Sequence, residues 1–128
     1  MKKEHYRDYA TEAYRFYAQT GNSEKYIQSM VSDSMPVEKA IEIHYAELAD
    51  LKAVEKVFAM LDMSVNGKYI RQAVEIVYMK DWNKPIAKRD ISNRVRYAEI
   101  HIPASEPQIY RWLRWARKTF AEERGLRT

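Results

Sequence analysis

The sequence has no cysteine, only three glycines and four prolines, and no long apolar run. Without cysteine the chain can form neither a disulfide nor a thiolate metal site, which suits a reducing compartment such as the cytoplasm. A membrane-spanning helix needs roughly 18 or more consecutive apolar residues, so we expect no membrane span. The charged N-terminus, MKKEHYRDYATEAYR, lacks the apolar stretch of a signal peptide. These absences favour a cytoplasmic location.

Sequence signatures of catalysis and of metal binding are also missing. The chain contains no Gly-rich phosphate loop, no G-x-S-x-G and no H-E-x-x-H. Its three histidines, His5, His44 and His101, have no spacing that builds a metal site. We therefore expect neither an enzyme nor a bound metal or cofactor.

Most of the 128 residues show the spacing of apolar side chains that is typical of helices, and no strand alternation is apparent. We predict an all-α fold of five to six helices, with a long central helix and a C-terminal helix-turn-helix. The predicted helices cover about Lys3–Thr20, Ser23–Asp33, Val37–Asp62, Lys68–Lys80, a stretch within Ile86–Ala98, and Ser105–Gly125. The near-heptad pattern of the central helix suits either a dimer seam or the spine of a monomeric bundle.

Charge divides the chain into two parts. Residues 1–67 carry 8 Lys and Arg against 11 Asp and Glu, whereas residues 68–128 carry 14 against 7. A basic C-terminal half predicts a polyanionic partner, while the acidic half serves another purpose. We place the boundary at the turn Ser64–Gly67, which separates an N-terminal helical region for interaction or dimerisation (1–66) from a DNA-binding region (67–128).

The last predicted helix carries the strongest local signals. Ser105 is a favourable N-cap, and Gly125 fits the position just past the helix end. Apolar residues recur on one face at Ile109, Leu113, Ala116 and Phe120. Basic residues occupy a different face at Arg111, Arg114 and Lys118, with Arg117 beside it. Such a helix has one surface for a core and another for an anion.

Three helices ending in a basic one predict a helix-turn-helix, with Glu99–Ala104 as the connector. Gln108 can read adenine and Arg111 guanine, because both side chains offer bidentate hydrogen bonding. Side chains further along, and those of the preceding helix, would contact phosphate. Of Trp112 and Trp115, one is expected in the core and the other at DNA or a subunit contact. The predicted DNA-binding set is Lys88, Arg89, Arg94, Arg96, Ser105, Glu106, Gln108, Tyr110, Arg111, Arg114, Arg117 and Lys118.

The segment SEPQIYRWLRWAR, with Ser105, Ile109, Leu113, Ala116 and Arg117 at its pattern positions, resembles the recognition helix of sigma factor region 4. The closing residues 120–126, FAEERGL, are similar to the C-termini of phage late-gene transcriptional regulators of the ArpU and RinA type. The resemblance implies a small helical protein that acts at a phage or prophage promoter inside its bacterial host cell.

The sequence therefore predicts a sequence-specific, double-stranded DNA-binding regulator of phage late genes. Expected partners are DNA, host RNA polymerase and a second copy in a homodimer. Two alternatives stay open. A phage DNA-packaging adaptor, the small terminase subunit, also joins a helix-turn-helix to an oligomerising helix, and a protein-only helical interaction module needs no DNA.

Overall fold

The computed structural model describes residues 4–128, and over this range the chain is all-helical, with no named strand. The all-α fold class is thus confirmed, but the helices number more than the predicted five to six. In chain order the elements are α1 (Arg7–Thr20), α2 (Ser23–Met30), α3 (Val37–Ile43), α4 (Tyr45–Asp62), α5 (Gly67–Val74), a π-helical segment (Glu75–Met79), α6 (Lys88–His101) and α7 (Glu106–Arg124). The predicted helix start at Lys3 lies outside the described residues.

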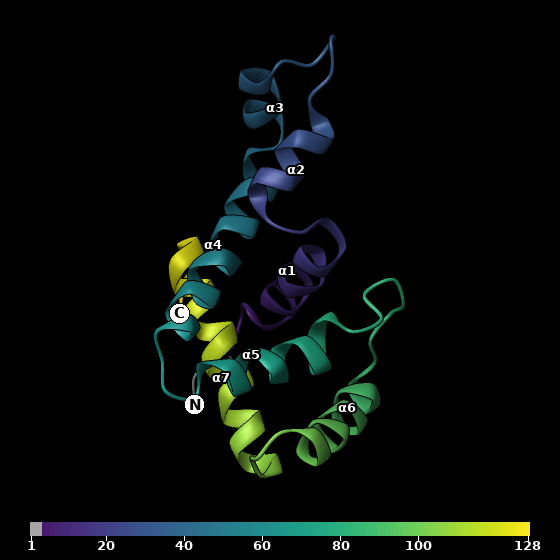
Figure 1. The fold of residues 1–128 in the computed structure, drawn as a ribbon, viewed down its shortest axis with the longest axis vertical. Helices are drawn as coiled ribbons and strands as arrows, with labels where there is room; N and C mark the ends of the chain where they lie inside the picture. The colour runs from purple at the N-terminus through teal and green to yellow at the C-terminus, as the bar shows by residue number, and fades with distance from the viewer. Residues whose placement is uncertain (1–3) are drawn as a thin grey trace.

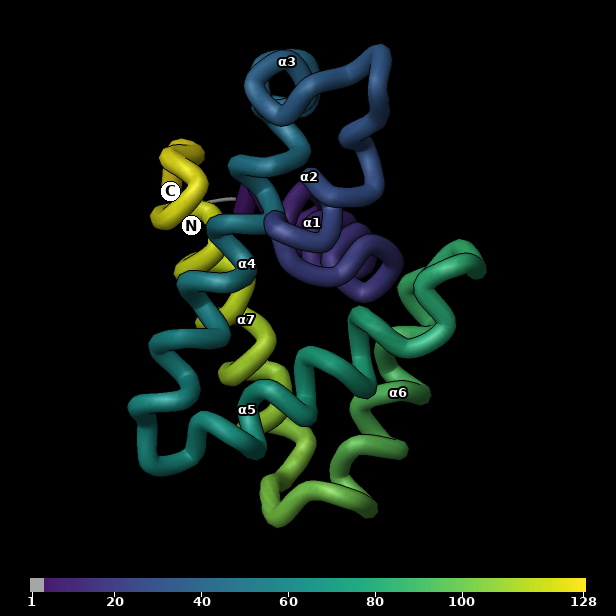
Figure 2. The backbone as a smooth tube through the Cα atoms, turned by 45° about the horizontal axis from the view of Figure 1, so that its top comes forward, coloured from purple at the N-terminus to yellow at the C-terminus, as the bar shows by residue number. Residues whose placement is uncertain are grey.

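Helices α4 and α7 lie side by side through the middle of the molecule, and α1 packs against both (Figures 1 and 2). Helix α5 lies across α7 and continues into the π-helical segment, which contacts α1 and α6, and α6 follows at the lower end. Helices α2 and α3 project at the opposite, upper end (Figure 1). None of the described helices is long and apolar enough to cross a membrane. In this elongated molecule, the α6–α7 turn and the α2–α3 pair lie at opposite ends (Figure 1).

One hydrophobic core joins α1, α4, α5, the π-helical segment, α6 and α7. Its largest side chains are Tyr14, Tyr78 and Phe120, all fully buried, with the ring of Tyr14 centred 6.1 Å from that of Tyr78 and 5.9 Å from that of Phe120. The Tyr14 hydroxyl donates to the Ala116 carbonyl oxygen at 2.6 Å, so the ring is buried without an orphaned polar atom. Both sides of the predicted 66/67 boundary share this core. The boundary is therefore a proposal about function and not a division of packing.

The predicted central helix, Val37–Asp62, is interrupted. His44 adopts φ −103° and ψ 28°, which ends α3 and starts α4 as a new helix. The half-buried His44 ring meets Tyr26 edge-on, with the Tyr26 hydroxyl 3.4 Å from Nδ1. Leu51, Val54 and Val57 are fully buried within the chain's own core. Helix α4 therefore packs at the centre of the helical bundle.

The turn between α4 and α5 depends on Gly67. A Cβ atom at this position would lie 1.6 Å from the Leu61 carbonyl oxygen, a distance that no side chain can occupy. The predicted Asn66–Gly67 turn thus lies where the backbone folds back most closely. It directs α5 across α7 and so sets the support on which α7 rests.

Candidate nucleic-acid interface

Helices α6 and α7 are joined by a connector of residues 102–105, shorter than the predicted connector Glu99–Ala104. Helix α6 continues to His101, and the Ile102 N–H still bonds to the Ala98 carbonyl oxygen at 2.8 Å. The Ile102 side chain is buried in the core, which fixes the connector. Helix α6 therefore ends at His101, beyond the predicted end near Ala98.

The predicted limits of the last helix are confirmed. The Ser105 hydroxyl accepts from the Gln108 backbone N–H, at 3.4 Å, and the Glu106 N–H donates to the Glu99 carboxylate at 3.1 Å. Both bonds satisfy donors that a helix start leaves without partners. Gly125 takes the left-handed conformation, with φ 80°, just past the last helical residue.

Arg111, Arg114 and Lys118 are all exposed on one face of α7, and we call these three residues the α7 basic stripe. Tyr110 and Trp115, each a little over one third exposed, flank the stripe. None of the ion pairs among residues 4–128 involves a stripe residue. The stripe therefore presents three positive charges that no carboxylate of the described chain neutralises.

The opposite face of α7 is fixed in the core. Ile109, Leu113, Ala116 and Phe120, the predicted apolar stripe, are fully buried. Trp112 is half-buried and packs against the same core, while Trp115 remains exposed, which settles the open assignment of the two tryptophans to core and surface. This burial determines the direction in which the basic stripe points.

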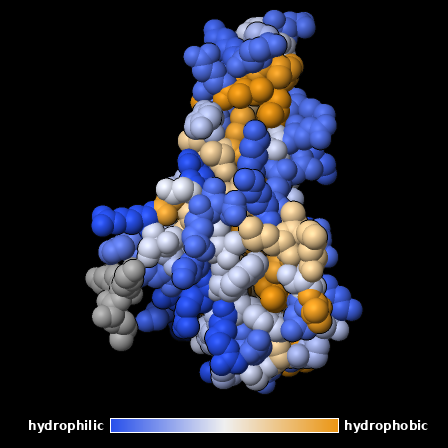
Figure 3. Space-filling view, turned by 90° about the vertical axis from the view of Figure 1, so that its left-hand side faces the viewer, coloured by the Kyte–Doolittle hydropathy of each residue, from blue (hydrophilic) through white to orange (hydrophobic). Residues whose placement is uncertain are grey.

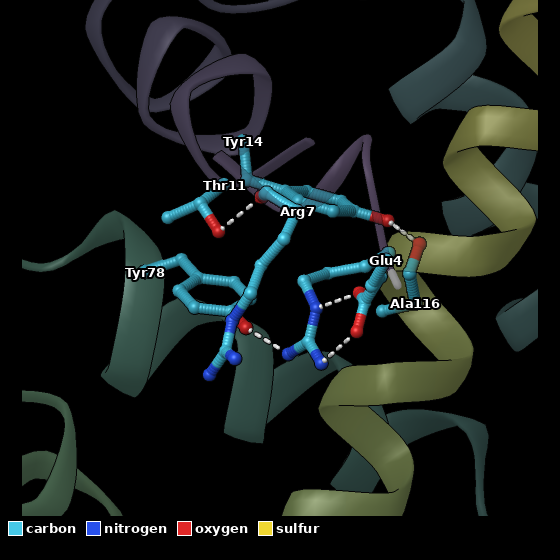
Figure 4. A network of polar contacts seen from close by, with 7 residues as sticks. Glu4, Arg7, Thr11, Tyr14, Tyr78 and Ala116 are labelled. Atoms are coloured by element: carbon cyan, nitrogen blue, oxygen red, sulfur yellow. Dashed lines mark hydrogen bonds and ion pairs between the residues drawn. The ribbon is translucent and has the colours of Figure 1, made fainter. Parts of the chain in front are cut away.

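Arg117, which the sequence predicts as a DNA-binding residue, is buried and does not belong to the exposed surface of α7. It is 6% exposed, and its guanidinium donates to both carboxylate oxygens of Glu4 and, at 2.6 Å, to the Tyr78 hydroxyl. Burial alone lowers the pKa of Arg117, but its hydrogen bonds and charge interactions with Glu4 and Tyr78 raise the pKa above the ordinary value. Figure 4 shows this network between the start of the chain, α1, the π-helical segment and α7. Arg117 thus holds α7 to the core and is not placed to contact DNA.

Arg94 is also turned inward, although the sequence placed it on an outer face. Its guanidinium donates to the carbonyl oxygens of Val77, at 3.0 Å, and Lys80, at 2.6 Å. These carbonyls lie at the end of the π-helical segment, where acceptors lack helical partners. Burial, and then the nearby charge of Arg15, lower the pKa of Arg94. The two hydrogen bonds of Arg94 thus hold the end of the π-helical segment.

The remaining α6 residues of the predicted set lie in two different settings. Arg89 is exposed without a recorded ion pair among residues 4–128. Arg96 is exposed and lies 3.7 Å from the Glu106 carboxylate. Lys88 is exposed and forms no ion pair within residues 4–128. Lys88 and Arg89 are therefore exposed α6 cations that no carboxylate among the described residues pairs with.

Sequence reasoning missed the role of Arg15. This residue of α1 is 4% exposed and donates to four backbone carbonyl oxygens, those of Tyr78, Asp81, Trp82 and Lys84. It thereby fixes the loop before α6. A charged residue inside the aromatic stripe of α1 was the only signal in the sequence, and it does not reveal which carbonyls lie opposite.

No group of three or more His, Asp or Glu side chains among residues 4–128 is arranged to hold a metal ion. Comparison with known proteins found no matching family model, no matching curated protein and no matching solved structure.

Proposed function

We propose that the protein is a sequence-specific, double-stranded DNA-binding transcriptional regulator of phage or prophage late genes, acting in the cytoplasm of the bacterial host. In this proposal α6, residues 102–105 and α7 serve as a helix-turn-helix, with α7 as the recognition helix. The α7 basic stripe carries the proposal, because it is exposed, unpaired and fixed in direction by the buried face of the same helix. The resemblance of Ser105–Arg117 to sigma factor region 4 supports it.

The stripe offers both kinds of contact that such a protein needs. Arg114 and Lys118, in the middle of α7, would neutralise phosphates and release counterions. Arg111 lies nearer the helix start, and its guanidinium donates to the Gln108 side-chain oxygen. That bond uses one of the five guanidinium donors and leaves the others for the two acceptors of guanine. Gln108 would then orient Arg111 and would not read a base by itself.

Selection of duplexes from a random pool tests sequence specificity. We expect the wild-type protein to enrich one motif, and Arg111→Ala to lose about 1–3 kcal/mol of specific affinity and to relax the choice of base at one position. Lys39→Ala is the matched control, since it removes one exposed positive charge from α3, far along the chain from α7. Equal enrichment by the wild type and Arg111→Ala would remove Arg111 as the reader.

A packaging adaptor remains the second candidate, because the α2–α3 end offers an oligomerisation surface. Val37, Ile41 and Ile43 are about 40–50% exposed there, and hydrophobic surface is visible at the upper end of the molecule in Figure 3. Contiguous apolar surface of this kind marks interaction sites. Light scattering distinguishes the candidates, since an adaptor forms a ring, whereas the proposed regulator is a monomer or a homodimer that also contacts RNA polymerase. A protein that binds no DNA in any state would be the protein-only module.

A further inference from the structure

A groove of about 590 Å³ lies between α1, the first half of α4 and the loop that follows the π-helical segment. Its volume is within the range of sites that bind ligands or side chains of a partner. Most of the lining is apolar surface, and its side chains include the aromatic residues Tyr9, Phe16 and Trp82 and the acidic residues Asp8, Glu12 and Glu47. The groove and the α7 basic stripe therefore have opposite charge.

The acidic residues of this groove differ in their partners. Asp50, also in the lining, accepts from the Arg124 Nε and from the Tyr9 hydroxyl, each at 2.7 Å, so its charge is compensated. Asp8, Glu12 and Glu47 form no ion pair with any residue from 4 to 128. Three carboxylates therefore line the groove without an ion-pair partner among these residues, and two of them, Asp8 and Glu12, also line a second cavity with Arg7 and Lys88.

The basic side chain in the wall does not cancel this charge through contacts in the groove. Arg15 lines the groove, but its guanidinium is buried and donates to the loop carbonyls of Tyr78, Asp81, Trp82 and Lys84. Those bonds hold the loop, and hence Trp82, at the edge of the groove. Trp82 is 42% exposed in spite of its large apolar ring. A half-exposed indole in the same groove as carboxylates without ion-pair partners is an arrangement that favours cations.

We propose that this groove docks a basic, amphipathic segment of a partner protein. The carboxylates attract Lys or Arg side chains, the indole of Trp82 receives one of them by a cation–π contact, and the apolar floor covers the segment's hydrophobic side chains. DNA is repelled by the same carboxylates, so the groove is a protein-binding surface that acts separately from α7. This inference does not depend on the proposed DNA binding.

The probe for this groove is a fluorescein-labelled amphipathic peptide built from leucine and lysine, measured by fluorescence anisotropy with the full chain. We expect saturable binding that weakens as salt is raised, and no binding of the same peptide with each lysine replaced by glutamate. The double variant Glu12→Gln, Glu47→Gln should bind about fivefold more weakly, because each exposed charge pair contributes little in water. Trp82→Ala should weaken binding by a similar factor.

The matched control is the double variant Glu38→Gln, Glu42→Gln, which removes two exposed carboxylates from α3, outside the groove. Circular dichroism confirms that each variant is folded. Unchanged affinity in the control, with losses in both groove variants, would support the proposal. An equal or larger loss in the control would overturn it, as would unchanged binding in Trp82→Ala or equal competition by spermine, which carries charge but no apolar side chain.

Discussion

Replacing Glu4 by glutamine should destabilise the protein more than any exposed charge substitution. Arg117 is nearly inaccessible, and the Glu4 side chain is 21% exposed, so the pair is largely removed from water. Removing one partner of a buried ion pair costs about 3–5 kcal/mol, because the other charge stays buried and uncompensated. Since Glu4 reaches solvent at one edge and Tyr78 still bonds to Arg117, we expect about 2–3 kcal/mol for Glu4→Gln.

Urea unfolding followed by circular dichroism measures this loss. With a slope of about 1.5 kcal/mol per molar urea, the midpoint should fall by roughly 1.3–2 M. Arg117→Met should cost less, about 1–2 kcal/mol, because it leaves no buried charge and lets Glu4 turn to solvent. The control Glu38→Gln, at an exposed site on α3, should stay within about 0.5 kcal/mol of the wild type.

The same variants separate a structural arginine from a DNA-binding one. Arg117→Met should lower stability yet keep DNA affinity under conditions where it is folded, whereas Arg114→Ala should do the reverse. The reasoning would be refuted if Glu4→Gln changed stability by less than about 0.5 kcal/mol. It would equally be refuted if Arg117→Met, though folded, lost as much DNA affinity as Arg114→Ala.

Three further predictions concern stability. Gly67→Ala should lower the urea midpoint strongly, because its Cβ would lie 1.6 Å from the Leu61 carbonyl oxygen. Burial is the main cause, and the charge of a nearby tyrosine the second, that raises the pKa of Tyr14 above its ordinary value of 10.0. The stability that the neutral Tyr14 side chain contributes is therefore complete below pH 10.0 and is lost as pH rises further. Circular dichroism should show unfolding at alkaline pH, and Tyr14→Phe should shift this unfolding to higher pH. The Glu55 carboxylate accepts from the Ser23 N–H at 3.0 Å, so Glu55→Ala should cost about 1 kcal/mol in urea unfolding, and Glu55→Gln, which keeps an acceptor, less.

The sequence predicted α7 best because its determinants are local. Ser105, the apolar spacing and Gly125 each act within one or two helical turns, and the structure places the helix from Glu106 to Arg124 as those signals require. The basic stripe followed from the same periodicity. The burial of Arg117, which the sequence places beside the stripe, does not follow from periodicity, because it depends on Glu4, more than a hundred positions away.

Other features depended on tertiary contacts that no local pattern contains. The break at His44 lies in a stretch without glycine or proline, where the ring meets Tyr26 of another helix. Arg15 and Arg94 resemble surface residues by type, yet each is turned towards backbone carbonyls at the loop after the π-helical segment. The groove beneath Trp82 likewise exists only because that loop is held in place.

The most direct test of the central claim is a salt titration of DNA binding by fluorescence anisotropy, with a labelled duplex and the triple variant Arg111→Ala, Arg114→Ala, Lys118→Ala. We expect the wild type to bind at about 50 mM salt and to weaken steeply towards about 200 mM, as counterion release requires. The triple variant should be folded and bind far more weakly, with a shallower salt dependence. If the wild type fails to bind any duplex at low salt, or the triple variant binds as tightly, the α7 basic stripe is not a DNA-binding surface.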